Sequence, residues 1–159
     1  MTLNTAGNFL DAEITKAIHA RYPDVQLSPR IIRTIKEKYG YVSESADPVE
    51  VTLNTQGIPQ QYDITQLLRE CCLSLTDPIS KAVQQLVGSF DPDFQERLRQ
   101  NILLAGGGSR LKGIDLAIEK SLLAYGGGRV ECVQDAEYCG STGALKMSME
   151  MPLDYWDRI

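Results

Sequence analysis

The sequence predicts an α/β fold that carries a small inserted α+β subdomain. The first part of the chain combines long helical stretches with one hairpin pattern, and the last part follows the order strand, helix, strand, helix. An apolar strand at 102–105 runs directly into three glycines and a further helix. A chain of 159 residues with 43% hydrophobic residues can bury a real core. We therefore expect one domain, or two small packed subdomains.

Helical spacing and cap residues predict the elements of the first forty residues. Apolar residues at helical intervals predict a helix over about residues 9–22. The pair Ser28-Pro29 is typical of an N-cap and first turn, so a second helix is expected to run to Gly40. Before both, Thr2–Thr5 has the pattern of the end of a strand.

A hairpin and a long helical stretch are expected next. Alternating apolar residues predict a strand at 49–54, which returns through a turn as a second strand at 58–62. Helical spacing from about residue 65 to Leu86 predicts a long helix with Leu86 facing inward. Pro78 should kink or split this helix, and Asp77 can restart it.

The remaining expected elements are short. They are a charged helix at 94–100 opened by Asp91 or Pro92, the strand 102–105, a helix at 111–122, a strand at 130–133 and a final helix at 142–150.

Composition excludes several classes of function. The net charge is −5 and no Lys/Arg cluster is present, so we expect no nucleic-acid partner. No apolar stretch approaches the roughly 20 residues that cross a bilayer, so no direct membrane insertion is expected. The four cysteines lack zinc spacing and a disulfide framework, which indicates reduced thiols and a cytoplasmic protein. His19 is the only histidine and receives no catalytic role.

The segment from Asn101 to Ile114 is the most informative for binding. Glycines after a strand let the backbone approach a ligand closely, and free amides at the following helix start favour polar or anionic groups. A dinucleotide fingerprint would need a third glycine where Leu111 stands, so that interpretation is weak. A purely structural turn is the alternative.

The string LLAGGGSRLKGI resembles the adenosine motif of the actin, heat-shock-70 and sugar-kinase superfamily. The resemblance implies a partial actin-like, ribonuclease-H-like lobe, in which adenosine lies against the glycines and the next side chains flank the base. The positions carried over here are Gly106, Gly107, Gly108, Arg110 and Leu111. A guanidinium stacks well on an aromatic ring, which suits Arg110, although a solvated arginine at a helix start is the alternative.

A second segment, 33–42, resembles the part of actins that brings a lysine and a glutamate to the nucleotide. The resemblance places Lys36 near adenine and Glu37 on a ribose hydroxyl. A carboxylate suits the latter task because it accepts hydrogen bonds from sugar hydroxyls. An ordinary exposed charged helix face is the alternative.

Other strings extend the resemblance over nearly the whole chain but over only about half of a full actin-like protein. Residues 6–11 resemble the segment after the second phosphate loop of bacterial actins. Residues 143–145 and 151–156, together with the string AGGGSR, are similar to the branch that organises magnetosomes into chains. This predicts three parts. Residues 1–28 start the large subdomain after the missing second phosphate loop, 29–88 form the inserted small subdomain with a connecting helix, and 89–159 form the adenosine-motif part with a C-terminal helix.

The resemblance implies ATP as ligand, with only its adenosine part held by this chain. Mg²⁺ is implied by the family, but the sequence contains no Asp-X-Gly and no phosphate loop of the family's type, so its ligands are not expected here. We therefore predict no catalytic residues, no metal ligands and no ATP hydrolysis by the chain alone.

The leading hypothesis is the nucleotide-side half of a filament-forming cytoskeletal protein of the magnetosome-organising type. Its expected partners are itself, full-length actin-like protomers and magnetosome-associated proteins, and its expected place is the cytoplasm alongside magnetosomes. One alternative is a truncated module that modulates a full filament without binding ATP. Another is a fragment of a rod-shape or plasmid-segregation actin.

Overall fold

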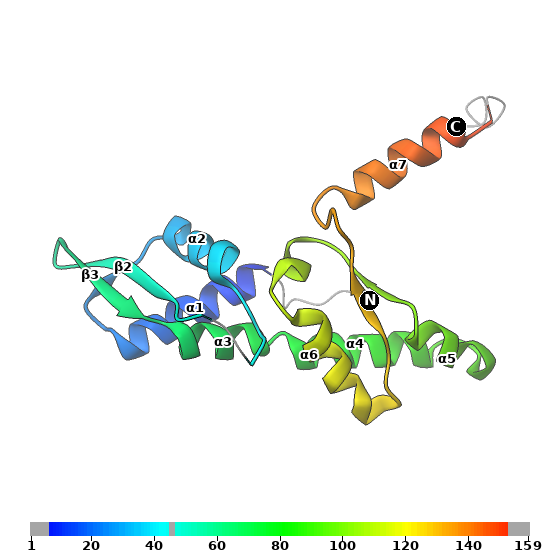
Figure 1. Cartoon of the computed structure of the whole chain (residues 1–159), viewed down its shortest axis with the longest axis horizontal. Coiled ribbons are helices and arrows are strands. Elements are labelled where there is room, and N and C mark those ends of the chain that lie inside the picture. The colour runs from blue at the N-terminus through cyan, green and yellow to red at the C-terminus, as the bar shows by residue number, and fades with distance from the viewer. Residues whose placement is uncertain (1–6, 45–46, 153–159) are drawn as a thin grey trace.

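The computed structural model describes residues 7–44 and 47–152, so the strand expected at Thr2–Thr5 lies outside the described residues. The molecule is elongated, with the hairpin at one end and α5 at the other (Figure 1). Its elements are α1 (Gly7–Arg21), β1 (Val25–Gln26), α2 (Pro29–Tyr39), β2 (Glu50–Thr55), β3 (Ile58–Asp63), α3 (Thr65–Leu73), α4 (Thr76–Gly88), α5 (Pro92–Arg99), β4 (Ile102–Leu104), η1 (Gly107–Arg110), α6 (Ile114–Leu122), η2 (Leu123–Tyr125), β5 (Val130–Cys132) and α7 (Cys139–Glu150).

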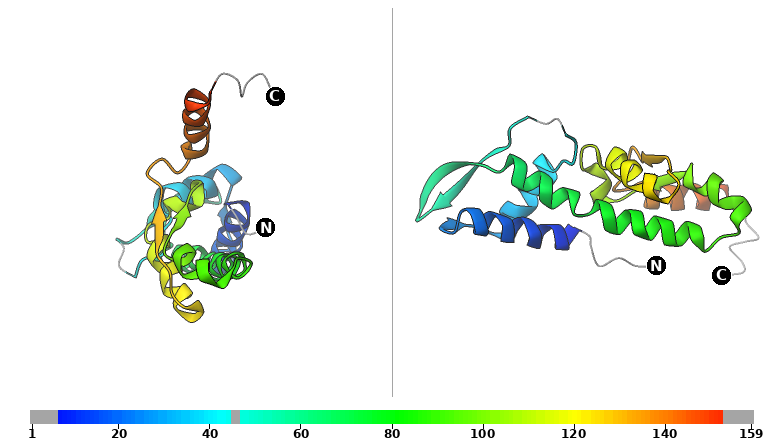
Figure 2. Two further views of the ribbon diagram at one scale, coloured as in Figure 1. Left: turned by 90° about the vertical axis from the view of Figure 1, so that its right-hand side faces the viewer. Right: turned by 90° about the horizontal axis from the view of Figure 1, so that it is seen from below.

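The N-terminal half packs α1, α2 and α3 beside a small antiparallel sheet (Figures 1 and 2). The sheet has the order β1-β2-β3, and β2 pairs with β3 over its full length. Val49, Val51 and Leu53 are all buried on one face, as the alternating pattern predicts. The strand β1 was missed, because two residues give no periodicity and only the pairing of Val25 with Thr55 creates it.

The predicted long helix is split into α3 and α4, as Pro78 indicated. The break lies at Ser74, four residues before the proline, because Pro78 has no N–H to donate to that carbonyl and its ring crowds it. Asp77 does not restart the helix: the N-cap position is Leu75, and Asp77 lies in the first turn of α4. Leu86 was wrongly expected to face inward, since it is exposed and Val87 is buried in its place.

The C-terminal half pairs β4 and β5 in parallel and covers them with α6, which also packs against α4. The helix expected to start at Leu111 starts at Ile114, because Gly113 adopts a left-handed conformation (φ 81°) immediately before it. The final helix starts three residues earlier than expected, at Cys139, and β5 ends at Cys132.

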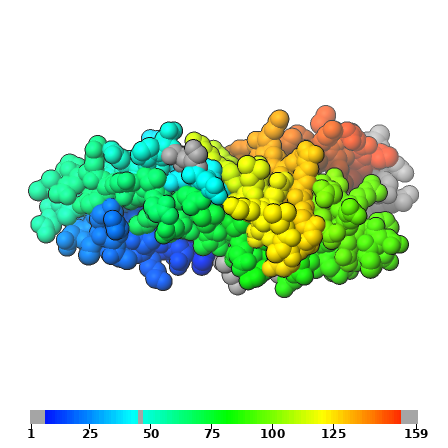
Figure 3. Space-filling model, turned by 60° about the horizontal axis from the view of Figure 1, so that its bottom comes forward, coloured from blue at the N-terminus to red at the C-terminus, as the bar shows by residue number. Residues whose placement is uncertain are grey.

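The last helix, α7, stands away from the body of the molecule (Figures 1 and 2) and contains no buried residue. The space-filling view shows the two halves as one continuous body (Figure 3). One buried cluster runs through both halves, from Leu10 in α1 to Val130 in β5. Helix α1 packs against α2 and α3, and α4 packs against α6. The subdomain boundaries expected at residues 28 and 88 stay predictions.

Candidate functional site

The glycine loop, residues 105–108, leads from β4 into the first half of η1 and is exposed along its length. Gly106 adopts a positive φ of 85° that favours glycine, and its amide donates to the Ala136 carbonyl over 2.6 Å. The Ser109 hydroxyl and amide both donate to the Gly106 carbonyl, at 2.8 and 3.1 Å, and hold the turn closed. A Cβ atom at Gly106, Gly107 or Gly108 would meet nothing within 4 Å. The backbone of this loop therefore faces open space that a ligand can enter.

A cavity of about 430 Å³ lies beside the glycine loop. Its lining comes from Ser109 and Arg110 in η1 and from residues 133–137 after β5. The Arg110 guanidinium lies 3.6 Å from the Glu137 carboxylate, and both side chains are mostly exposed. An exposed pair of this kind contributes at most about 1 kcal/mol, so Arg110 can turn toward a ligand at little cost.

Sequence reasoning missed the segment 133–137. It follows a parallel strand, and ligands of open α/β sheets bind beyond the carboxyl ends of such strands. Applied to the strand expected at 130–133, that rule would have predicted that the residues after it line a binding site.

Backbone contacts join the glycine-loop segment to the end of α2. Val42 N–H donates to the Lys112 carbonyl over 2.9 Å, and Lys112 N–H donates to the Gly40 carbonyl over 3.4 Å. A Cβ atom on Gly40 would lie 2.4 Å from the Lys36 carbonyl oxygen and 2.5 Å from Leu111 Cδ2. Gly40 thus permits a close approach that brings the two resemblance segments together.

Leu111 differs from the glycines before it because it is buried. Its side chain is buried in the core against Gly40 and not on the open side of the loop. The base-flanking role that the resemblance implies for Leu111 stays a prediction, and its buried side chain makes core packing the alternative. Packing decides the position, because Leu111 closes the gap between η1 and the end of α2.

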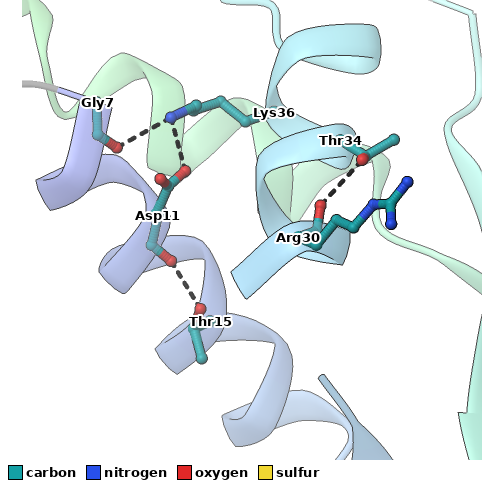
Figure 4. Close-up of polar contacts among 6 residues, drawn as sticks. All are labelled: Gly7, Asp11, Thr15, Arg30, Thr34 and Lys36. Carbon is teal, nitrogen blue, oxygen red and sulfur yellow. Dashed lines mark hydrogen bonds and ion pairs between the residues drawn. The ribbon is translucent and has the colours of Figure 1, made fainter. Parts of the chain in front are cut away.

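Lys36 and Glu37 occupy different environments on α2. The Lys36 ammonium lies 2.7 Å from Asp11 Oδ1 and donates to the Gly7 carbonyl over 3.1 Å, both in α1 (Figure 4). Glu37 is exposed on the face of α2. Their roles at adenine and ribose stay predictions, with Glu37 accessible to a ligand and the Lys36 ammonium occupied by α1.

Three of the four cysteines are held as protonated thiols. Burial raises the pKa of Cys72 to about 11, and burial also raises the pKa of Cys71 and Cys132, which suppresses the nucleophilic thiolate. Within residues 7–44 and 47–152, no group of three or more His, Cys, Asp or Glu side chains is arranged to hold a metal ion. Over the same residues, no helix is both long and apolar enough to span a bilayer.

Comparison with known proteins identifies the family of this chain. The model of the family described as "MreB/Mbl protein" matches residues 1–153. The chain belongs to the MreB/Mbl family. Among curated members, it is similar to the actin-like protein MamK of Paramagnetospirillum magneticum, with 31% identity over 100% of this chain and 46% of MamK. MamK of Magnetospirillum gryphiswaldense is 33% identical over 98% of this chain and 43% of that protein. This member of the family thus spans about half the length of the curated relatives it matches.

Solved structures agree with the family assignment. A MamK double helical filament superposes with a TM-score of 0.90 at 32% identity, covering 96% of this chain and 47% of that one. A non-polymerising MamK mutant bound to AMPPNP gives 0.87 at 31% identity, covering 94% and 46%. MreB5 of Spiroplasma citri, at 18% identity and a TM-score of 0.78 over 99% and 47%, shows the shared fold. The family member described here is therefore a MamK-like, partial actin-like lobe.

Proposed function

We propose that this chain supplies the adenosine side of an ATP site in a MamK-like, filament-forming protein. The observation that supports it is the open glycine loop, which is followed at Lys112 by backbone contacts to the end of α2. A structural relative of this same lobe binds AMPPNP. The glycine loop would receive adenosine, Arg110 would stack on the base, and Glu37 would accept from a ribose hydroxyl.

Mg²⁺ chemistry does not fit the described residues. They offer no cluster of carboxylates, and phosphoryl transfer needs a metal, a phosphate cradle and an oriented nucleophile. The chain alone is therefore expected to show no ATP turnover above buffer. A Mg²⁺-dependent turnover that persists through purification would contradict this.

Nucleotide binding can be tested on the chain itself by an NMR titration with ATP. Binding should be weak, with a dissociation constant near millimolar or above, or roughly −4 kcal/mol at most. Gly107→Ala should weaken it without affecting folding, because the added methyl enters the open side of the loop. Arg110→Ala and Glu37→Ala should also weaken it, and Lys112→Ala serves as the matched control. Equal effects of all four substitutions, or micromolar binding, would contradict the assignment.

We also propose that the chain associates with actin-like filaments alongside magnetosomes, in the cytoplasm. Its structural relatives include MamK filaments, and α7 contains no buried residue. Co-sedimentation with filaments of Magnetospirillum gryphiswaldense MamK tests the filament contact directly. If the chain co-sediments but ATP causes no shift in its NMR spectrum, a filament-modulating module that does not bind nucleotide becomes the better description.

A further inference from the structure

The ion pair between Lys36 and Asp11 differs from the other ion pairs of the described residues. Its side chains are only 15% and 22% exposed, whereas every side chain in the other four pairs is at least 58% exposed. It also joins two helices across 25 positions of sequence. Exposed pairs contribute little, but removing one partner of a largely buried pair leaves an uncompensated charge. Among these ion pairs, the loss of this one is therefore expected to perturb the structure most.

The receiving site on α1 is shaped for an ammonium group. Lys36 Nζ donates to the Gly7 carbonyl and lies 2.7 Å from Asp11 Oδ1, one helical turn further along α1 (Figure 4). A Cβ atom on Gly7 would lie 3.3 Å from Lys36 Nζ, so a side chain there would crowd the ammonium. The absence of a side chain at Gly7 leaves room for the lysine.

Asp11 is the group that makes this location favourable. The N-terminus of a helix carries partial positive charge and repels cations. Lys36 nevertheless brings its ammonium to the first turn of α1, where it is mostly removed from water. Without the Asp11 carboxylate, an ammonium at this place would be both desolvated and repelled. The Lys36 side chain is then expected to leave the first turn of α1.

The same lysine is connected by backbone contacts to the segment that follows the glycine loop, Leu111 and Lys112. The Lys36 carbonyl accepts from Gly40 N–H over 2.9 Å, and the Gly40 carbonyl accepts from Lys112 N–H over 3.4 Å. Lys112 follows Leu111, whose side chain lies against Gly40. A movement of Lys36 would thus shift the last turn of α2, and with it Glu37 and the support of the loop.

We propose that Asp11 is a positioning residue of the candidate nucleotide site. It anchors Lys36 on α1 and thereby holds the last turn of α2 against Leu111 and Lys112, which follow the glycine loop. The proposal rests on the proposed function in so far as the loop binds nucleotide. The positioning itself can be measured without any nucleotide.

The test uses the full chain with Asp11→Asn, Lys36→Met and the double variant, and measures amide hydrogen exchange without ATP. Asp11→Asn should accelerate exchange at Gly40 and Val42 by about tenfold relative to buried core amides such as that of Ile118. Lys36→Met should do the same, and the double variant should be no worse than either single variant, because all three remove one shared contact. Asp11→Glu, which keeps the charge, should retain most of the protection.

The matched control is Asp77→Asn, which breaks the exposed pair with Lys81 on α4 and should leave Gly40 and Val42 unchanged. Equal acceleration of exchange at Gly40, Val42 and Ile118 would reduce the pair to a general stabilising contact and overturn the proposal. Additive effects in the double variant would overturn it too. If the wild-type chain shows no ATP binding while exchange responds as expected, the nucleotide function fails and the positioning stands.

Discussion

At the scale of single residues, Gly40 sets how closely α2 approaches the glycine-loop segment. A methyl group there would overlap the Lys36 carbonyl oxygen and Leu111 Cδ2. We expect Gly40→Ala to lower the free energy of unfolding by about 1–3 kcal/mol, as overpacking of a filled site does. Urea unfolding followed by circular dichroism measures this change.

Gly88 provides the control for Gly40. It ends α4, and a Cβ atom there would meet nothing within 4 Å, so Gly88→Ala should be neutral or stabilising by up to about 1 kcal/mol. Equal stability of the Gly40 and Gly88 variants would show that the segment joining α2 to the glycine loop can move apart freely.

At the scale of elements, α2 carries Lys36 and Glu37 and depends on its N-cap. The Ser28 hydroxyl accepts from Ile31 N–H over 3.3 Å, and Pro29 occupies the first turn, as the sequence predicts. Ser28→Ala should cost about 1 kcal/mol of unfolding free energy, and Ser28→Asp should restore it, because aspartate caps equally well. Thermal denaturation of the wild-type chain and the two variants measures this effect. Identical midpoints would show that the cap contributes nothing to stability.

At the scale of the whole molecule, the C-terminal half exposes apolar surface that no described residue covers. Leu145 and Met149 lie on one side of α7 and are 60% and 79% exposed. The parallel pair β4–β5 also leaves Leu103 exposed, whereas parallel sheets are normally covered on both faces. Exposed apolar patches of this kind mark association sites.

We therefore expect the purified chain to self-associate as its concentration rises. Replacing Leu145 and Met149 together by Glu should shift the population toward monomer without changing the circular dichroism spectrum, because neither side chain supports the core. Size-exclusion chromatography with light scattering measures the shift. A control with Thr142→Glu and Ser148→Glu adds the same charge to polar positions of α7. A wild-type chain that stays monomeric at all concentrations would contradict this prediction.

Much of the fold follows from local pattern. The cap at Ser28, the alternation in β2 and the split before Pro78 are all visible in the sequence, because capping, periodicity and the missing proline N–H act over a few residues. The short strand β1 and the exposure of Leu86 were not, because partners distant in the chain decide them.

By itself, the sequence determined the type of the main elements, the glycine loop and the resemblance to actin-like proteins. Those are properties of contiguous residues. Only the tertiary structure decided that Leu111 belongs to the core, that Gln134–Glu137 line the cavity and that Asp11 receives Lys36. Each of these depends on which segments meet, and that is settled by the close approach at Gly40 and by the packing of α1 against α2, which no local pattern encodes.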